Sequence, residues 1–230
     1  MNIAIIPARG GSKRIPRKNI KEFCGKPMIA YAINAAIESR LFGHIIVSTD
    51  DNETCNIATA WGAEVPFTRP NELADDHTTT VPVIAHAIEA CKKLGWQFDY
   101  VCCIYPGVPL IQIDDIIGSL ELLMKVNCGY CFPITEHPSK IQRALRLLSN
   151  NRVQPFHPEF ETTRTQDLES AYYDAGQFYW GKTNTWLTKK HIHNNGIGYA
   201  IPNWRVVDID TNEDWQHAER IFKSITGHPE

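Results

Sequence analysis

The sequence of 230 residues contains no long uncharged apolar segment and no excess of basic residues. A membrane-spanning helix needs roughly 18–20 predominantly apolar residues, so we expect no membrane partner. The first residues lack a basic stretch followed by a long apolar core, so we expect no signal peptide. The 23 Lys and Arg residues against 26 Asp and Glu residues give a formal net charge of -3, which argues against a general nucleic-acid-binding protein.

The seven cysteines do not form the pattern of a disulfide-bonded protein. Their number is odd and they are scattered through apolar segments, which favours reduced thiols and predicts a cytoplasmic protein. Cys128 and Cys131 form a C-x-x-C motif inside a predicted strand, where residues i and i+3 face opposite sides. No second Cys or His pair completes a zinc site, so we interpret both as core residues. His191 and His193 have no obvious carboxylate partner, and we interpret them as part of a solvated loop.

Short apolar runs alternate with helical patterns through the first half of the chain. Apolar runs without alternation are typical of strands that are buried on both faces of a parallel sheet. We therefore predict one domain over residues 1–230, an α/β fold with a doubly wound, mostly parallel, Rossmann-like sheet. The predicted strands of this half are residues 2–6, 44–49, 63–67 and 100–105, and the predicted helices are residues 27–39, 53–61, 80–94 and 114–125.

The second half has shorter predicted strands that are separated by polar, proline-containing loops. Residues of about 137–173 are interpreted as an inserted β-rich arm or dimerisation element. The chain then returns to a last strand at residues 206–209 and a closing helix at residues 213–224. The other predicted strands are residues 129–135, 144–148, 153–156 and 176–180.

A cluster of seven cations follows the first predicted strand, with Glu22 as the one acid among them. Ligands of doubly wound folds bind beyond the carboxyl ends of the strands. Gly10 and Gly11 allow backbone amides to approach an anion, and the cations neutralise it, so the loop suits a polyphosphate. A solvated basic loop is the alternative. The cluster consists of Arg9, Lys13, Arg14, Arg17, Lys18, Lys21 and Lys26.

Two common phosphate-binding motifs do not match this loop. A Walker A loop requires G-x-x-x-x-G-K-[ST], whereas Gly10 and Gly11 are adjacent. The dinucleotide fingerprint G-x-G-x-x-G is also missing from the loop. Neither motif therefore explains the loop, and a polyphosphate site of another kind and a solvated basic loop both stay open.

The segment IPARGGSKRIPRKNI resembles the signature of CMP-sugar synthetases, the cytidylyltransferases of nine-carbon 2-keto sugar acids. Its extended form, KRIPRKNIKEFCGKPMIAY, is most similar to the members that use pseudaminic acid. The resemblance implies a nucleotide-diphospho-sugar transferase-like fold, a homodimer, and a reaction of CTP and a nonulosonic acid that yields a CMP-sugar and pyrophosphate. N-acylneuraminate, legionaminate and a 3-deoxy-octulosonate remain alternative substrates. A nucleotide-binding module without catalysis and a polyanion-binding protein are the alternatives outside this family.

The resemblance also implies roles for individual residues. Those implied in catalysis are Arg9, Lys18, Asp208 and Asp210. Those implied in binding CTP are Ala8, Arg9, Gly11, Ser12, Lys13, Asn19, Arg69, Thr78 and Thr80. Those implied in binding the sugar acid are Tyr105, Arg164, Gln166, Tyr173 and Gln177. Arg164 could bind the sugar carboxylate bidentately, and a salt bridge within the arm is an equally open interpretation.

Asp208 and Asp210 form a D-x-D motif at the end of the last predicted strand. Residues i and i+2 of a strand point to the same face, so both carboxylates could meet one cation. Mg²⁺ is typically held by one or two carboxylates together with substrate phosphates. A solvated acidic turn that leads into a helix, capped by Thr211 or Asn212, is the alternative. The similarity to the D-I-D-T metal segment of the family favours Mg²⁺.

Several departures from the family pattern fall near the expected sugar site. The wider family tends to have Q-P-T-S-P-L-R after the strand at residues 100–105, whereas this chain has YPGVPLI from Tyr105 to Ile111. Asp174 stands near a position where the family has Asn. Gln177 stands where the family has a small apolar residue, and together with Asp174 it fits a sugar that differs from N-acetylneuraminate, whereas the 105–111 loop is expected to alter sugar contacts without abolishing CTP binding.

Overall fold

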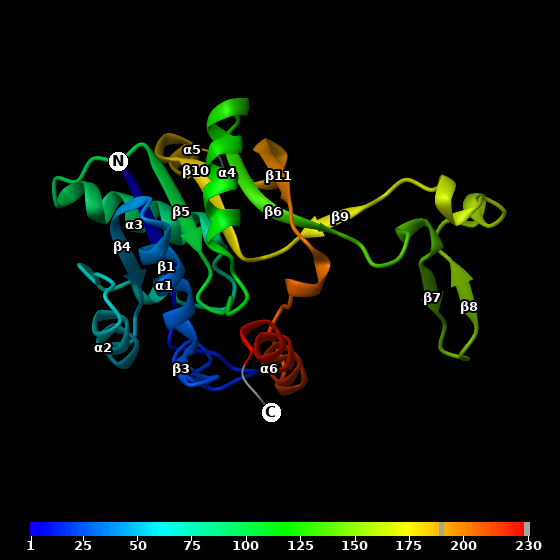
Figure 1. Ribbon diagram of the computed structural model, residues 1–230, viewed down its shortest axis with the longest axis horizontal. Coiled ribbons are helices and arrows are strands. Elements are labelled where there is room, and N and C mark those ends of the chain that lie inside the picture. Colours follow the sequence, from blue (N-terminus) through cyan, green and yellow to red (C-terminus); the bar gives the residue numbers. More distant parts are fainter. Residues whose placement is uncertain (189–190, 228–230) are drawn as a thin grey trace.

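A central sheet with helices on both faces forms the body of the protein (Figure 1). In this computed structural model, which describes residues 1–188 and 191–227, seven strands form that sheet. They run in the order β11-β6-β10-β5-β1-β4, and β9 pairs with β6. The strands are β1 (Asn2–Pro7), β4 (Phe42–Ser48), β5 (Tyr100–Ile104), β6 (Tyr130–Glu136), β9 (Tyr172–Asp174), β10 (Phe178–Lys182) and β11 (Gly196–Ala200).

Most strands of this sheet run in the same direction. β1 is parallel to β4 and β5, and β11 is parallel to β6. β10 is antiparallel to both β5 and β6, so these two neighbours point the same way, and β9 is antiparallel to β6. The predicted α/β class with a mostly parallel sheet is thus confirmed.

The strands are apolar on both faces because helices cover both. In β1, Ala4 and Ile6 pack with the helices of one face, and Ile3 and Ile5 pack with those of the other. All four side chains are fully buried, as expected for a strand between two helical layers. The first face carries α1 (Met28–Ser39), α2 (Asn52–Ala60) and α4 (Ile113–Val126), and the second carries α3 (Thr80–Lys93) and α5 (Thr183–Thr188).

A third, smaller core joins the two ends of the chain. The C-terminal helix α6 (Asn212–Thr226) packs on the hairpin of β2 (Glu22–Phe23) and β3 (Lys26–Pro27) (Figure 1). The rings of Phe23 and Trp215 meet edge to face, with centroids 5.4 Å apart. Thr211 and Asp214 form a capping box that fixes the first turn of α6. This packing brings the segment before α6 next to the basic loop.

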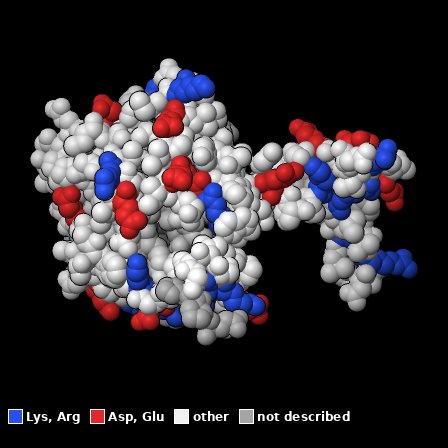
Figure 2. All heavy atoms as spheres, in the orientation of Figure 1, with Lys and Arg blue, Asp and Glu red and all other residues white. Residues whose placement is uncertain are grey.

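Residues 137–171 leave the sheet between β6 and β9 and form an arm beside the body (Figures 1 and 2). Its antiparallel hairpin consists of β7 (Leu145–Leu147) and β8 (Val153–Pro155). Leu147 and Val153 are 70% and 59% exposed. Short 3₁₀ turns fold the rest of the arm: Ile141–Arg143, Pro158–Phe160 and Thr165–Asp167.

The prediction of a strand at residues 63–67 was wrong. This segment makes two isolated bridges to the β4 side, Glu64 with Ile46 and Thr68 with Thr49. Pro66 lies between the bridges and has no amide hydrogen to donate, so a continuous ladder cannot form.

The prediction of a last strand at residues 206–209 was also wrong, since residues 206–210 form no ladder. A 3₁₀ turn at Asn203–Arg205 and the buried pair of Arg205 with Asp115 direct the chain away from the sheet toward α6. Sequence patterns missed the short elements β2, β3, β9, β11 and α5, together with the 3₁₀ turns Asn71–Leu73 and His193–Asn195. Among the described residues, no helix is both long and apolar enough to span a bilayer.

Candidate active site

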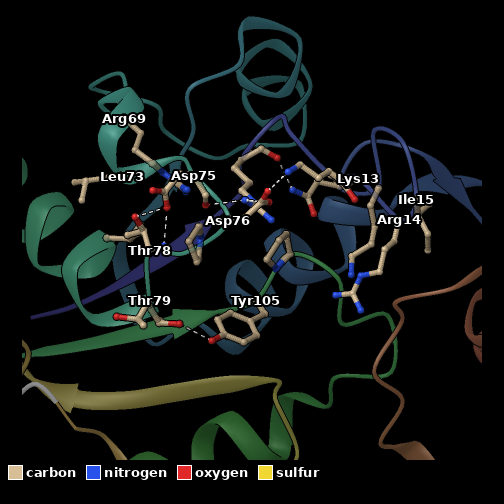
Figure 3. A pocket seen from close by; sticks show the side chains of 18 of the residues that line it. Lys13, Arg14, Ile15, Arg69, Leu73, Asp75, Asp76, Thr78, Thr79 and Tyr105 are labelled. Carbon is tan, nitrogen blue, oxygen red and sulfur yellow. Dashed lines mark hydrogen bonds and ion pairs between the residues drawn. The ribbon is translucent and has the colours of Figure 1, made fainter.

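A cavity of about 720 Å³ opens beyond the carboxyl end of β1 and next to α3 (Figure 3). Arg69, Leu73 and Thr78 lie on one side of it and Lys13 and Arg14 on the other. Most residues expected to bind CTP line it, as do one of the two Asp residues and Tyr105. The expected residues in its wall are Arg9, Ser12, Lys13, Lys18, Asn19, Arg69, Thr78, Thr80, Tyr105 and Asp210.

The loop after β1 is held by backbone contacts on the side away from the cavity. The Ala8 amide donates to the Ser48 carbonyl at 2.9 Å, which extends the β1–β4 ladder, so Ala8 braces the loop and its amide is already used. The Gly10 amide donates to Asp50 Oδ1 at 3.0 Å. A Cβ on Gly10 would come within 2.8 Å of Asp51 Cβ, whereas one on Gly11 would meet nothing within 4 Å. The close approach therefore requires Gly10, and Gly11 leaves open space.

Asn19 connects the loop to the helix that follows it. It is 9% exposed, and its Nδ2 donates to the Arg9 carbonyl at 3.0 Å. Its own carbonyl accepts from the Ile29 amide at 2.8 Å, which ties the loop to α1. Asn19 therefore fixes the backbone that carries Arg9.

Four cations of the basic loop line the cavity, and each is paired with an acid. Arg9 and Lys13 both contact Asp76. The other two meet Asp210, which comes from the segment before α6. Lys18 Nζ lies 3.5 Å from Asp210 Oδ1 and donates to the Ile209 carbonyl at 2.5 Å, and Arg14 Nη1 lies 2.7 Å from Asp210 Oδ2.

The other cations of the cluster lie outside the cavity wall. Arg17 makes ion pairs with Asp51 and Glu53. Lys21 lies over the Trp215 ring, 4.5 Å from its centroid. The cluster thus divides between the site and the surface, and Arg14 is the member at the site that sequence reasoning left unassigned.

Arg69 is buried at the back of the cavity, 4% exposed. Its Nε donates to Ser48 Oγ at 3.1 Å, and its Nη2 donates to the Ser48 carbonyl. Burial lowers the pKa of Arg69 to about 10, so the guanidinium stays charged at neutral pH. The guanidinium of Arg69 is thus charged, fixed in place and next to the cavity. Its N–H groups that are not used by Ser48 can donate to a carbonyl oxygen of a nucleotide base.

The two threonines near α3 have different surroundings. Thr78 Oγ1 lies 2.7 Å from Asp75 Oδ1, and the Thr78 amide donates to the same oxygen. Thr80 is the first residue of α3, and its Oγ1 lies 2.6 Å from the Tyr105 hydroxyl. Burial raises the pKa of Tyr105 to about 12, so its hydroxyl remains protonated. Tyr105 therefore forms a neutral wall of the cavity.

A second cavity of about 460 Å³ adjoins the first, because Lys18, Tyr105 and Pro106 line both. Tyr173 and Asp208 also line the second cavity. Asp208 and Asp210 thus face neighbouring cavities, which share the Lys18 side chain.

The two carboxylates have the chemistry that a hard cation requires. Desolvation, followed by repulsion from Asp210, raises the pKa of Asp208. A divalent cation would relieve this repulsion, and oxygen donors suit Mg²⁺. Among the described residues no cluster of three or more His, Cys, Asp or Glu side chains could hold a metal. The pair therefore fits a metal that takes its remaining ligands from phosphates and water.

The other residues expected to bind the sugar acid lie outside both cavity walls. Gln177 is 4% exposed and follows Gly176, which lines the second cavity. The Gln177 Nε2 donates to the Arg205 carbonyl at 3.1 Å. The backbone carbonyl of Gln177 accepts from the Tyr105 amide at 2.9 Å. Arg164 and Gln166 are exposed on the arm. One chain alone does not bring these two residues to the cavities.

Asp174, which the sequence placed near the sugar site, lines the second cavity and has two partners that the sequence did not indicate. Asp174 Oδ2 accepts from the Tyr179 hydroxyl at 2.9 Å and lies 2.8 Å from His193 Nε2. His193 thus has a carboxylate partner, which the sequence could not indicate because β10 and α5 separate the two residues. Cys128 and Cys131 are both free thiols, and Cys131 is buried in the core.

A mostly parallel α/β sheet with a cationic cavity beyond its first strand is the arrangement of a nucleotide-binding α/β protein, and comparison with known proteins places it among the nucleotidyltransferases. A family model described as cytidylyltransferase matches residues 3–192. The chain belongs to this cytidylyltransferase family, as its sequence predicted.

Individual relatives agree with this assignment. The chain is 40% identical over 223 residues to the pseudaminic acid cytidylyltransferase of Campylobacter jejuni, covering 96% of each chain. It is 29% identical over 230 residues to the CMP-N,N'-diacetyllegionaminic acid synthase of Legionella pneumophila, again covering 96% of each. The fold is similar to that of CMP:2-keto-3-deoxy-manno-octonic acid synthetase complexed with CTP, with a TM-score of 0.73, 15% identity, and coverage of 97% of this chain and 99% of that one.

Proposed function

We propose that the protein transfers CMP from CTP to a nonulosonic acid, pseudaminic acid, and releases CMP-pseudaminate and pyrophosphate. The observation that carries this proposal is the pair of adjoining cavities, one cationic and one with Tyr173 and Asp208 in its wall, joined at Lys18 and Tyr105. The 40% identity to a pseudaminic acid cytidylyltransferase supports the choice of sugar acid.

CTP binds in the first cavity in this proposal. The buried Arg69 and the half-buried Thr80 face the cytosine base, and Arg9, Lys13 and Ser12 of the loop face the phosphates. Lys18 lies where the two cavities meet, which suits a contact with the α-phosphate. Nucleotidyl transfer needs positioning and charge stabilisation more than covalent help from the protein.

The sugar acid binds in the second cavity, and its 2-hydroxyl oxygen attacks the α-phosphorus in line. The bond between the α-phosphorus and the bridging oxygen breaks, and pyrophosphate leaves with the electron pair. Arg9 and Lys13 stabilise the charge that grows on this leaving group. The attacking hydroxyl loses its proton to solvent as the new phosphorus–oxygen bond forms.

We further propose that Asp208 and Asp210 hold Mg²⁺ during the reaction. When bound, the ion would neutralise phosphate oxygens and lower the pKa of a coordinated hydroxyl. Asp210 would then exchange its contacts with Arg14 and Lys18 for the ion, which would release both cations toward the phosphates.

We also propose a homodimer in the cytoplasm. The exposed apolar hairpin of the arm supports a second copy as its partner, since monomers rarely expose such surfaces. Arg164 and Gln166 lie on this arm, so a partner's arm could bring them to the second cavity. The free cysteines support a reducing compartment.

The test is a measurement of pyrophosphate release with Mg²⁺ and each of CTP, UTP, ATP and GTP. Each nucleotide is combined with pseudaminate, N,N'-diacetyllegionaminate, N-acetylneuraminate or a 3-deoxy-octulosonate. Release with CTP and pseudaminate, at a kcat/KM well above that of the other pairs, is expected. A preference for another acid would replace the proposed substrate. The absence of pyrophosphate release with every pair would refute the proposed reaction.

A further inference from the structure

Asp76 binds two cations that the proposed reaction assigns to phosphate. Its Oδ1 lies 2.6 Å from Arg9 Nη1, and its Oδ2 contacts Lys13 Nζ. The Asp76 side chain is 32% exposed and lines the cavity between the two walls (Figure 3). The Asp76 carboxylate therefore occupies the two cations that would bind a triphosphate.

The loop that carries Asp76 is braced by its own side chains. Asp75 Oδ1 accepts from the amides of His77 and Thr78 at 3.0 and 2.6 Å. Arg9 Nη1 also donates to the Asp75 carbonyl at 2.7 Å. These contacts present Asp76 to the cavity and keep the Asp75 carboxylate turned toward its own loop.

We propose that Asp76 is an internal counter-anion that competes with the β- and γ-phosphates of CTP, and with pyrophosphate, for Arg9 and Lys13. This inference rests on the proposed function. The cations that bind the β- and γ-phosphates of CTP also bind pyrophosphate after the reaction. Pyrophosphate keeps most of the negative charge of CTP but has lost the contacts of the cytidine, so its affinity depends mainly on Arg9 and Lys13. A carboxylate that returns to Arg9 and Lys13 accelerates pyrophosphate release, at a cost in affinity for CTP.

The competition has a quantitative signature. The apparent affinity of a ligand is its intrinsic affinity multiplied by the fraction of protein in which the site is free. CTP and pyrophosphate both need Arg9 and Lys13, so Asp76 lowers both affinities by one common factor. CMP lacks the β- and γ-phosphates, so its affinity does not depend on Asp76.

The variant Asp76→Asn keeps the size of the side chain and removes its charge. Dissociation constants for CTP, pyrophosphate and CMP are measured by calorimetry on the full chain. Exposed ion pairs are individually weak, so we expect CTP and pyrophosphate to bind roughly three- to thirty-fold more tightly to the variant. CMP affinity should be unchanged, and pyrophosphate should become a stronger product inhibitor by the same factor. Asp76→Ala should shift the constants in the same direction.

Glu72→Gln provides the matched control. It removes the same charge from the neighbouring turn Asn71–Leu73, without touching Arg9 or Lys13, and should leave all three constants unchanged. Equal CTP affinity of wild type and both Asp76 variants would overturn the inference, and so would an equal gain for CMP, which would indicate a general charge effect. Failure of the wild-type protein to bind CTP would refute the proposed function itself, and is read from the same titrations.

Discussion

Arg205 and Asp115 form an ion pair inside the protein, with side chains only 10% and 7% exposed. Arg205 Nη2 donates to Asp115 Oδ1 at 3.0 Å, which ties the segment before Asp208 to the first turn of α4. The Gln177 side chain donates to the backbone carbonyl of Arg205. The placement of the two carboxylates proposed to bind Mg²⁺ therefore depends on a contact buried beside the sheet.

Asp115→Asn should destabilise the protein strongly. The substitution leaves the Arg205 guanidinium buried without a charged partner, which costs about 3–5 kcal/mol. The free energy of unfolding from urea titrations, followed by circular dichroism, measures this loss. Asp114→Asn is the control, since Asp114 lies in the same first turn but is exposed. Its loss of charge near the helix N-terminus should cost about 0.3–1 kcal/mol. Equally small losses in both variants would contradict the assignment.

Local patterns predicted the parts of the site that follow one another in the chain. A buried strand, two glycines and the cations after them are contiguous, so Arg9, Lys13 and Lys18 could be assigned to one cavity before the fold was known. The family resemblance added Arg69, which is distant in sequence and whose exposed or buried state no local pattern reveals.

Contacts between distant segments could not be predicted in this way. Asp115 and Arg205 are 90 residues apart, and nothing in the pattern around either indicates a partner. Residues 206–209 have the β-branched, apolar composition of a strand, but the chain there turns toward α6 and finds no sheet edge. The role of Gln177 in binding the sugar acid stays a prediction, and the hydrogen bond from its Nε2 to the Arg205 carbonyl is a further contact between distant segments that no local pattern indicates.

Asp210→Asn should change the response to metal. If Asp210 contributes a ligand to Mg²⁺, the variant should need at least roughly ten-fold more Mg²⁺ for half-maximal pyrophosphate release. CTP binding in EDTA should be equal or tighter, because Arg14 and Lys18 lose the carboxylate that holds them. Glu213→Gln, an exposed change in the first turn of α6, should leave the Mg²⁺ titration unaltered. A wild-type Mg²⁺ titration in Asp210→Asn would make the D-x-D segment structural only.

The pair of Asp51 and Arg17 should make stability depend on pH. Hydrogen bonds from Arg17, and then from Thr54, hold the pKa of Asp51 at about 2, below its ordinary value of 3.8. A lowered carboxyl pKa contributes stability above about pH 4, and this contribution is lost as the pH falls through about 2. Asn is an equally good helix N-cap, so Asp51→Asn removes the charge and keeps the cap of α2.

Urea titrations of wild type and Asp51→Asn at several pH values test this dependence. The wild type should be more stable by about 1 kcal/mol at pH 7, once solvent screening is included. The difference should shrink steadily between about pH 4 and pH 2. A difference that stays constant over this range would show that the charge of Asp51 does not stabilise the loop.

The arm hairpin should control assembly. Leu147 pairs with Val153 across β7 and β8, and both side chains are exposed in the single chain. Arg146 and Gln154 pair at the next position, which faces the opposite side because side chains alternate along a strand. One face of the hairpin is thus apolar and the other polar, and the apolar face is the surface that a second copy would cover.

Leu147→Asp should therefore convert the proposed dimer to a monomer in sedimentation velocity and light scattering. Each dimer would have to bury two Asp carboxylates in an apolar contact, which is strongly unfavourable. Gln154→Asp adds the same charge to the polar face and should leave the mass unchanged. If the partner's arm completes the second cavity, Leu147→Asp should also raise the KM for the sugar acid while CTP affinity stays constant. A wild-type mass for Leu147→Asp would place the dimer interface elsewhere or exclude the dimer.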